Sequence, residues 1–503
     1  MSYVNFILRS YFQNKNSNIR KIVNEPLLCQ KNCFHYLVKA ARHTVWGKKY
    51  NYRQLTSYRQ FQETVPLNTY ESIYPYIERM IKGERNVLWR GKVRMFSKSS
   101  GTSGSKSKFI PVSLESLIEC NYKGGKDTLS LYAQNRPDTR LFSGKTLSLS
   151  GSMRPSELNP KAICGDISAL LIKYIPDWAN HLRTPPKKIA LIDGWNEKLE
   201  LFAQHTKNEN ITGLAGVPSW ILIILKRILE IEGKETLDSI WPNLELFMHG
   251  GVNFTPYLPQ YKEITHTDKL LFWQIYNASE GYFATQDRAY ADDMLLLLNN
   301  GVFFEFIPFN DFYNHDFHAI PLDEVKENVN YAIVISTNAG LWRYIIGDVI
   351  QFTSLNPYRI IITGRTTHFI NAFGEELIVD NVEKALQITC EKTQSLVSEY
   401  TAAPVYLDNH KKACHEWLIE FETPPSDLQI FTDILDAELM KINSDYEVKR
   451  SFDLLLHKPI IHQVPQGTFI QWMASKGKLG GQFKVPRLSN NRLIMDEIMK
   501  MLE

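Results

Sequence analysis

The sequence predicts an α/β protein with a large N-terminal domain of β-sheets covered by helices and a small C-terminal domain. From Phe96 onward, strand-like apolar runs alternate with helical patterns, which is typical of a sheet with helices on its faces. From about Gly301, short strand-like runs follow one another closely, as in an antiparallel β-barrel or small sheet. The 503 residues suffice for two or more domains.

The elements expected before residue 301 are mostly helical at first and then mixed. The first ninety residues carry few turn signals and read as helix. The most apolar run, Trp220–Leu225, is cut short by two basic residues, so it predicts a buried or amphipathic helix and is too short to span a bilayer. We expect strands at Lys188–Ile192, Leu244–Met248 and Leu271–Tyr276, and a helix at Ser219–Glu232.

The region from residue 301 to the C-terminus is expected to hold the barrel and the small α+β domain. A capping box at Asp380–Glu383 predicts the start of a helix. The predicted strands of the barrel are Val302–Ile307, Tyr331–Ser336, Arg343–Ile345, Val349–Thr353 and Arg359–Thr363.

Composition is that of an ordinary globular chain, with 44% apolar and 22% charged residues. The net charge of +3 gives no general basic field, so we expect no nucleic-acid partner. The first twenty residues lack a signal-peptide pattern, and the six cysteines form neither Cys-x-x-Cys nor a zinc-spaced cluster. We therefore expect a cytosolic protein with free thiols and no membrane partner. A monomer is the simplest expectation for the oligomeric state, which the sequence does not determine.

A loop rich in serine and glycine, Ser97–Lys108, offers many donors to one anion. Small residues let backbone N–H groups approach phosphate oxygens, while hydroxyls and lysines add donors and charge. The alternative is a flexible linker, although both flanks resemble one globular domain. The loop is neither a Walker P-loop nor a nucleophile elbow, because the residues that define those motifs are missing.

Four later segments also carry groups suited to a nucleotide. After an apolar strand, Tyr276 could stack on a base and Glu280 could hold Mg²⁺, a cation that prefers oxygen ligands. Asp348 could accept bonds from ribose hydroxyls, Arg365 follows a glycine that could act as a hinge, and Lys484 could neutralise a phosphate. Each segment has a plainer interpretation, as a β-turn, a Gly-Asp turn or a solvated basic loop.

In this order, the five segments resemble the adenylate-forming superfamily of acyl-CoA synthetases, luciferases and peptide-synthetase adenylation domains. A closer similarity, from about Phe96 to Arg487, is to the GH3 family of acyl acid amido synthetases, and the compact chain is closer to its bacterial members than to plant ones. The segments that carry this similarity are Gly216–Trp220, Met248–Val252, Gly301–Pro308, His415–Phe421 and Gln482–Arg487.

The resemblance implies an N-terminal domain of residues 1–364, with the barrel at about 301–364, and a mobile C-terminal domain of residues 365–503. It implies that ATP adenylates a carboxylic acid, releasing pyrophosphate, and that an amine, such as that of an amino acid, then displaces AMP. Plant members have a lysine where this chain has Glu375, so no phosphate contact is expected from that loop.

The resemblance also implies a role for each matching residue. The phosphates would be held by Ser99, Ser100, Gly101 and Thr102, and the adenine would lie along Tyr276 and Ala278. Ser279 would contact the α-phosphate or acyl carbonyl, Glu280 would hold the Mg²⁺, Asp348 would bind the ribose, and Arg365 would contact the ribose or a phosphate. Lys484 would reach the phosphate during adenylation, and the acyl pocket would be bordered by Val217 and Trp220.

Two alternatives stay open beside the amido synthetase. An acyl-CoA synthetase would share the first half-reaction and transfer the acyl group to coenzyme A. A catalytically idle fold would bind nucleotide or a partner without turnover, and the presence of Glu280, Asp348 and Lys484 argues against it.

Overall fold

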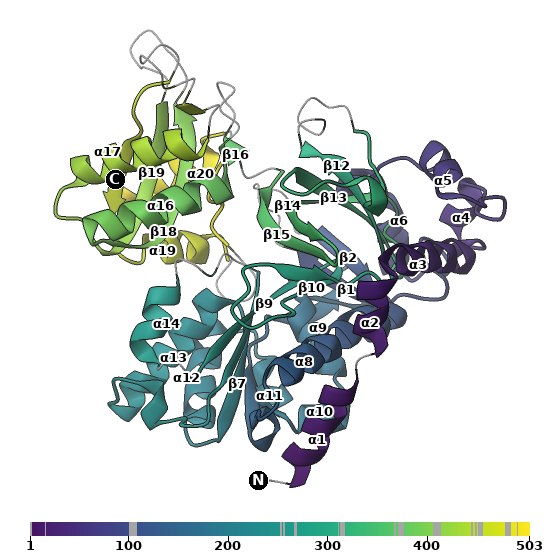
Figure 1. Ribbon diagram of the computed structural model, residues 1–503, viewed down its shortest axis with the longest axis horizontal. Coiled ribbons are helices and arrows are strands. Elements are labelled where there is room, and N and C mark those ends of the chain that lie inside the picture. Colours follow the sequence, from purple (N-terminus) through teal and green to yellow (C-terminus); the bar gives the residue numbers. More distant parts are fainter. Residues whose placement is uncertain are drawn as a thin grey trace.

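The structure is a computed structural model that describes most of the chain. Figure 1 shows a large body built on β-strands and a smaller C-terminal unit beside it. The described residues are all except 1–2, 16, 100–107, 252–253, 255–256, 266–268, 310, 312–316, 367–368, 371–376, 406–413, 444–445, 448–449, 451–455, 478–483 and 490.

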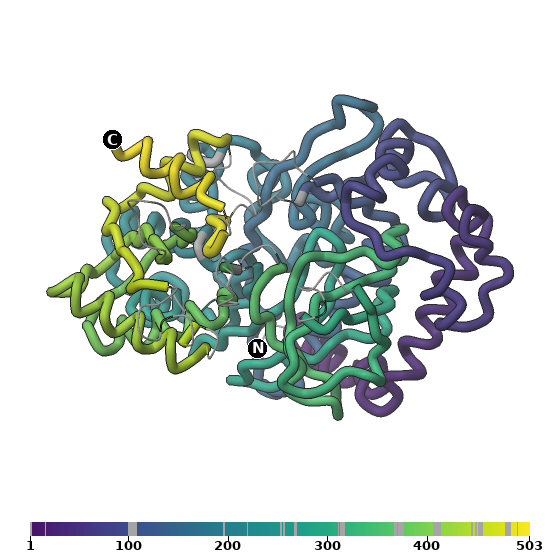
Figure 2. The backbone as a smooth tube through the Cα atoms, turned by 90° about the horizontal axis from the view of Figure 1, so that it is seen from above, coloured from purple at the N-terminus to yellow at the C-terminus, as the bar shows by residue number. Residues whose placement is uncertain are grey.

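The first ninety residues are largely helical, as predicted. Local capping explains some of the helix starts, because the hydroxyl of Thr44 accepts from the backbone N–H of Gly47 and Pro26 occupies the first turn of its helix. Figure 2 places α3, α4 and α5 at the end of the molecule opposite the C-terminal unit. The helices are α1 (Tyr3–Asn14), α2 (Ser17–Asn24), α3 (Pro26–Ala41), α4 (Val45–Lys49), α5 (Tyr58–Thr64) and α6 (Tyr70–Ile81).

Within the described residues, eleven strands form one mixed sheet. Strand β9 is the point of change, because it pairs parallel with β8 and antiparallel with β10. In order across the sheet the strands are β12 (Val302–Pro308), β13 (Asn330–Thr337), β14 (Tyr344–Leu355), β15 (Tyr358–Arg365), β11 (Met294–Leu296), β10 (Gly281–Thr285), β9 (Leu271–Ala278), β8 (Leu246–His249), β7 (Ile211–Gly216), β3 (Lys145–Ser148) and β6 (Arg183–Thr184).

The expected β-barrel is instead the antiparallel end of this sheet. Strands β12 to β15 pair in sequence, and β15 continues through β11 into the rest of the sheet, so the described hydrogen bonds define an open sheet. The runs predicted at 343–345 and 349–353 form one strand, β14, with a glycine at Gly347 in the left-handed region (φ 94°) between them.

Helices cover the parallel half of the sheet (Figure 1). Helix α13 (Pro218–Glu232) confirms the predicted helix, with a proline in its first turn and Gly233 in a left-handed C-cap. The strand predicted at 188–192 is wrong, because a short helix, α11 (Lys187–Ala190), begins directly after Pro185 and Pro186. Nearby helices are α8 (Lys123–Asn135), α9 (Ile167–Tyr174), α10 (Asp177–Asn180), α12 (Trp195–Thr206) and α14 (Leu258–Ile264).

A second sheet of four strands flanks the serine- and glycine-rich loop. Its order is β2 (Lys108–Val112), β1 (Met95–Ser99), β5 (Asn159–Gly165) and β4 (Met153–Ser156). Strands β1 and β2 are antiparallel, with Ser99 opposite Lys108. The loop therefore connects the two strands of a hairpin, which is incompatible with a linker between domains.

The C-terminal unit packs helices against a three-stranded sheet. The sheet order is β18 (Leu396–Val405), β19 (Cys414–Thr423) and β20 (Ile460–Val464), preceded by the short pair β16 (Phe369–Ile370) and β17 (Leu377–Ile378). The helices are α16 (Val379–Thr393), α17 (Leu428–Ile442), α19 (Thr468–Ser475) and α20 (Leu493–Leu502).

The helix predicted from the capping box at 380–383 is α16, but the box itself is wrong. The helix is capped at Ile378, whose N–H donates to the side chain of Asn381 at 3.3 Å, so Asp380 lies inside it and pairs with Lys384. Glu383 is buried instead of capping, because its carboxylate accepts from the hydroxyl of Tyr400.

The described helices, the cysteines and the apolar cores complete the description of the fold. None of the described helices combines the length and apolar character needed to cross a bilayer. The six cysteines, which all lie in the described part of the chain, form no disulfide with one another. Separate apolar cores stabilise the large sheet, its parallel half and the C-terminal unit.

Candidate active site

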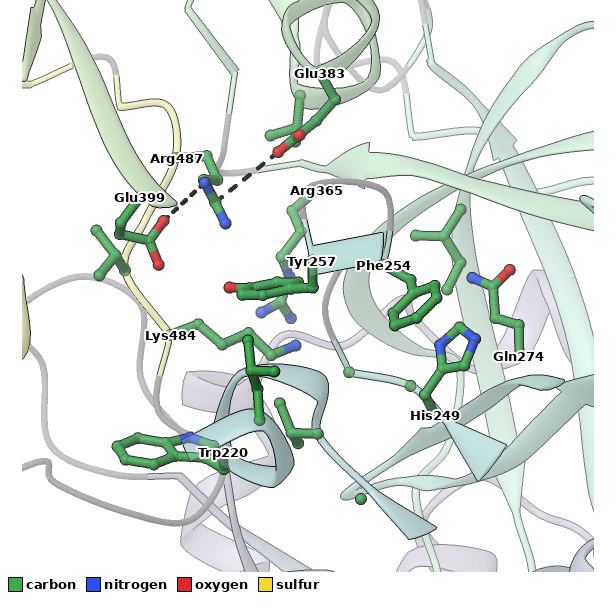
Figure 3. Close-up of a pocket in the computed structure, with 18 of the residues that line it drawn as sticks. Trp220, His249, Phe254, Tyr257, Gln274, Arg365, Glu383, Glu399, Lys484 and Arg487 are labelled. Carbon is green, nitrogen blue, oxygen red and sulfur yellow. Dashed lines mark ion pairs between the residues drawn. The ribbon is translucent and has the colours of Figure 1, made fainter. Parts of the chain in front are cut away.

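A cavity of about 2280 Å³ opens where the carboxyl ends of parallel strands face the C-terminal unit (Figure 3). The residues that follow β3, β7, β8 and β9 all line it. This edge of a parallel sheet is the usual place for a ligand, because several loops converge there. The cavity is lined by nine residues predicted to act in the site: Val217, Trp220, Tyr276, Ala278, Ser279, Glu280, Asp348, Arg365 and Lys484.

The turn between β9 and β10 presents an acid to this cavity. Ala278 pairs with Gly281, so Ser279 and Glu280 form a two-residue hairpin loop. Burial, together with the negative charge of Asp348, raises the pKa of Glu280 to about 7. A carboxylate in such a place favours a bound cation, because the cation offsets both effects.

Asp348 is held by two residues from different strands. Its Oδ2 accepts from the hydroxyl of Tyr276 at 2.6 Å, and its Oδ1 lies 2.8 Å from Nε of Arg365, the residue opposite it on β15. The ring of Tyr276 is only 5% exposed. A carboxylate has about four acceptor positions, so these two contacts fix its orientation and leave capacity for a ligand's hydroxyls.

Lys484 enters the same cavity from the C-terminal unit (Figure 3). A Cβ placed on Gly251 would lie 3.8 Å from the lysine Nζ, so the ammonium lies over the glycine that follows β8. Gly251 has φ 86°, which favours glycine. Lys484 is exposed by surface area, but the protein around it, with Arg365 nearby, lowers its pKa to about 8.

An ion-pair cluster holds the segment that carries Lys484. Arg487 lies 2.7 Å from Glu399 and 3.9 Å from Glu383, and its guanidinium is 4.5 Å from the centre of the Tyr400 ring (Figure 3). The backbone is held as well, because the hydroxyl of Thr401 donates to the carbonyl of Pro486. The sequence did not predict these contacts. It marked Arg487 only as the last residue of Gln482–Arg487, one of the segments that resemble the GH3 family.

The acyl side of the cavity is apolar and aromatic. Val217 precedes α13 and Trp220 lies in its first turn, as expected for residues at the border of an acyl pocket. Phe254, Tyr257 and His249 line the same region and were not predicted (Figure 3). In the sequence, they are marked only by their position at or just after the end of a parallel strand, and His249 also by the similar segment Met248–Val252.

A buried lysine orients the loop after β3. Lys198 donates to the carbonyls of Ser150 and Gly151 at 2.9 and 3.1 Å, and burial lowers its pKa to about 8. Gly151 is required by close packing, because a Cβ there would collide with the carboxylate of Asp166. The loop lines the cavity, and the two bonds from Lys198 tie it to α12.

The phosphate-loop prediction can be followed only at its flanks. Ser99 ends β1, while Ser100, Gly101 and Thr102 lie outside the described residues, so their role stays a prediction. Phe109 donates its backbone N–H to the hydroxyl of Tyr70, which anchors the loop's second strand to α6. Glu375 also lies outside the described residues.

Arg343, in the segment that leads to Asp348, points away from the cavity. Its guanidinium forms a buried ion pair with Glu305 at 2.9 Å and donates to the carbonyls of Gln62 and Val65. It therefore joins the N-terminal helices to the sheet and takes no part in the candidate site.

A Mg²⁺ ion is compatible with the donors present. Among the described residues, no three His, Cys, Asp or Glu side chains gather as a complete metal site. Mg²⁺, however, usually takes one or two carboxylates and completes its shell with water and substrate phosphates. Glu280 supplies such a carboxylate at the edge of the cavity.

Comparison with known proteins first defines the class. Over 96% of this chain and 95% of the other, the fold matches a solved structure described as GH3.15 acyl acid amido synthetase, with a TM-score of 0.77 and 16% identity. A 2-hydroxyisobutyryl-CoA ligase in its postadenylation state matches with a TM-score of 0.58 and 11% identity, covering 96% of this chain and 91% of that one. The fold is thus one shared by amido synthetases and acyl-CoA ligases.

Within that class, the chain belongs to the GH3 family. The models of the GH3 family N-terminal, central and C-terminal domains match residues 15–270, 295–365 and 380–493. A relative from Arabidopsis thaliana, indole-3-acetic acid-amido synthetase GH3.3, is 23% identical over 93% of this chain and 90% of its own length. The resemblance predicted from the sequence is confirmed.

Proposed function

We propose that this protein is an ATP-dependent acyl acid amido synthetase that conjugates a carboxylic acid to an amino acid through an acyl-adenylate. Family membership over nearly the whole chain supports this function. The observation that carries the assignment of the site is one cavity that holds Glu280, Asp348 and Arg365 from the sheet and Lys484 from the C-terminal unit.

The first half-reaction joins the acid to AMP. A carboxylate oxygen of the acid attacks the α-phosphorus of ATP, the bond to the β-phosphate oxygen breaks, and pyrophosphate leaves. In the proposed site, Asp348 accepts from the ribose hydroxyls, Tyr276 and Ala278 lie along the adenine, and Ser279 donates to the α-phosphate or acyl carbonyl. The ammonium of Lys484 stabilises negative charge that develops on the phosphate.

The second half-reaction forms the amide. The amine nitrogen attacks the acyl carbon, the bond to the phosphate oxygen breaks, and AMP leaves while the nitrogen loses a proton. No covalent bond to the protein is needed, so the contribution of the chain is positioning and charge stabilisation. Val217 and Trp220 would border the acyl group.

Mg²⁺ and the phosphate loop complete the proposal. Glu280 would hold Mg²⁺, which neutralises phosphate charge when bound. Ser99, Ser100, Gly101 and Thr102 would cradle the phosphates from the hairpin loop between β1 and β2, and Arg365 would contact the ribose or a phosphate.

We also propose that residues 365–503 form a mobile domain that rotates against residues 1–364 between the half-reactions. At the rim of the cavity, Lys226 of the large body pairs with Glu422 of the C-terminal unit at 3.4 Å, and both partners are partly exposed. Such a pair contributes little and breaks easily. One chain supplies every proposed group, so the enzyme would act as a monomer.

A second candidate function is an acyl-CoA synthetase. It is favoured by the fold match to a 2-hydroxyisobutyryl-CoA ligase. The two functions differ only in the nucleophile of the second step, so the first half-reaction does not distinguish them.

The test is a screen of carboxylic acids against amino acids and coenzyme A, with mass detection of the product. We expect pyrophosphate release that requires both ATP and an acid, and an amide as the product. A thioester as the main product would favour the second candidate. No release with any acid of a broad panel, from folded protein, would refute both.

A further inference from the structure

One part of the acyl side of the cavity is polar although its surroundings are aromatic. His249 ends β8 and lies directly opposite Gln274 on β9, so the two side chains stand next to each other on adjacent parallel strands. Both line the cavity, and Figure 3 shows them together beside Phe254. Gln274 lies five residues before Ser279, the first residue of the turn, which is roughly 17 Å along the strand.

His249 is deeply buried and lacks a partner for one ring nitrogen. The residue is 4% exposed, and Nδ1 has no hydrogen bond within the part of the chain that the structure describes. A buried polar atom without a partner destabilises the folded protein, so a buried nitrogen of this kind calls for an explanation, such as a ligand that pairs with it.

The ring of His249 is fixed by aromatic neighbours. It stacks on Phe254 at 4.1 Å between ring centres with 27° between the planes, and Phe247 lies 5.5 Å away on the same strand. The ring therefore keeps one orientation, and Nδ1 cannot turn to another partner without losing these contacts.

The cations of the cavity lie a short way from His249. The ammonium of Lys484 lies over Gly251, two residues beyond His249 in the sequence, and Figure 3 shows Arg365 near Lys484. Burial lowers the pKa of His249 to about 3, so its imidazole is neutral at physiological pH. The carboxylate of an acid is attracted to the cations, which leaves a neutral polar group of the acid for the neutral histidine.

We propose that His249 and Gln274 form a specificity site that selects carboxylic acids carrying a hydroxyl or N–H group at the end remote from the carboxylate. This inference rests on the proposed function and deepens it. A hydroxyl suits either tautomer of His249, because it can donate or accept, and the amide of Gln274 can do both. An acid without such a group leaves Nδ1 unpaired, which is the condition under which a site discriminates strongly.

The experiment compares matched pairs of acids that differ by one group. The panel holds phenylacetic, 3-phenylpropionic and decanoic acids with their terminal hydroxyl derivatives, and indole-3-acetic acid with its N-methyl derivative. The measurement is kcat/KM for pyrophosphate release. We expect the wild-type chain to prefer one hydroxyl or N–H member by roughly tenfold to a hundredfold.

Three variants test the assignment to these residues. His249→Phe keeps the ring that packs on Phe254 and removes both nitrogens, so the preference should fall to within about threefold of unity. His249→Asn puts an amide atom near the position of Nδ1 and should retain most of the preference. His205→Phe, on the partly exposed face of α12, is the matched control and should retain all of it.

Binding without turnover separates this inference from the proposed function. Calorimetric titration of the same acid pairs reports the preference even if no acid is adenylated. Turnover of acids with no preference in any pair would overturn the inference and leave the function standing. An unchanged preference in His249→Phe would also overturn it, and Gln274→Leu gives the same test if His249→Phe does not fold.

Discussion

The two halves of the candidate site are built in different ways. Glu280, Tyr276, Asp348 and Arg365 all belong to one sheet, where cross-strand neighbours and a 2.6 Å hydrogen bond fix their orientation. Lys484 comes from the small unit, and only its own segment is anchored there, through Arg487. The groups proposed to bind the nucleotide are therefore preorganised in the sheet, while the lysine proposed to stabilise charge at phosphorus depends on how the two units lie.

Removing the lysine tests this division most strongly. We expect Lys484→Met to lower kcat for pyrophosphate release by roughly 100- to 1000-fold, because one preorganised charge at the phosphate is lost. Binding of ATP should change little, since the sheet holds the nucleotide. The measurements are steady-state pyrophosphate release and calorimetric ATP binding.

Lys458→Met is the control for this prediction, because Lys458 is an exposed lysine of the same unit that pairs with Asp433. The division between the two halves would be wrong if Lys484→Met lost ATP binding in proportion to catalysis. Amide formation from a preformed acyl-adenylate should survive in this variant, since no pyrophosphate leaves in that step.

A substitution in the sheet should have the opposite signature. Asp348→Asn weakens both the ion pair to Arg365 and the acceptor for ribose hydroxyls. We expect a rise of roughly 10- to 100-fold in the KM for ATP, since bonds to charged groups contribute about 1.5–3 kcal/mol. Kinetics at saturating ATP should recover most of kcat; a kcat that stays low would show that Asp348 does more than bind.

The anchor of the lysine segment should have an intermediate effect. Arg487→Gln leaves Glu399 without its cation and loosens the position of Lys484. We expect kcat to fall by about tenfold with the KM for ATP unchanged, because misplacement of a catalytic group costs rate rather than binding. Thermal denaturation measures the accompanying loss of stability. The double variant Lys484→Met with Arg487→Gln should be no slower than Lys484→Met alone if the arginine acts through the lysine.

The pH dependence should give the smallest effect. Lys484 is a cation below its pKa of about 8 and neutral above it, so its charge is lost as pH rises. We expect kcat/KM for ATP to fall by about fourfold between pH 7 and pH 8.5, since this ratio reports groups of the free enzyme. In Lys484→Arg this alkaline decline should disappear, because a guanidinium stays charged. A decline of equal size in that variant would assign it to another group.

Much of the local structure was predictable because it depends on neighbours in sequence. The helix that begins at Pro218, the strand that ends before Ser279 and the hairpin turn itself follow from apolar periodicity and from turn residues. The errors fall where packing overrides a local pattern. Glu383 fits a capping box, yet it is buried against Tyr400, and the strand expected at 188–192 is a helix that begins after two prolines.

The sequence by itself determined the order of the candidate nucleotide segments and the family, and it singled out Glu280, Asp348 and Lys484 as candidates for the site. Only the tertiary structure decided which residues meet. Tyr276 and Asp348 are 72 positions apart, and their bond exists because β9 and β14 bring both side chains to one cavity. The opposition of His249 and Gln274 depends in the same way on strand register. Periodicity along a chain reports which face of an element is buried, but it carries no information about which strands are neighbours or how they align.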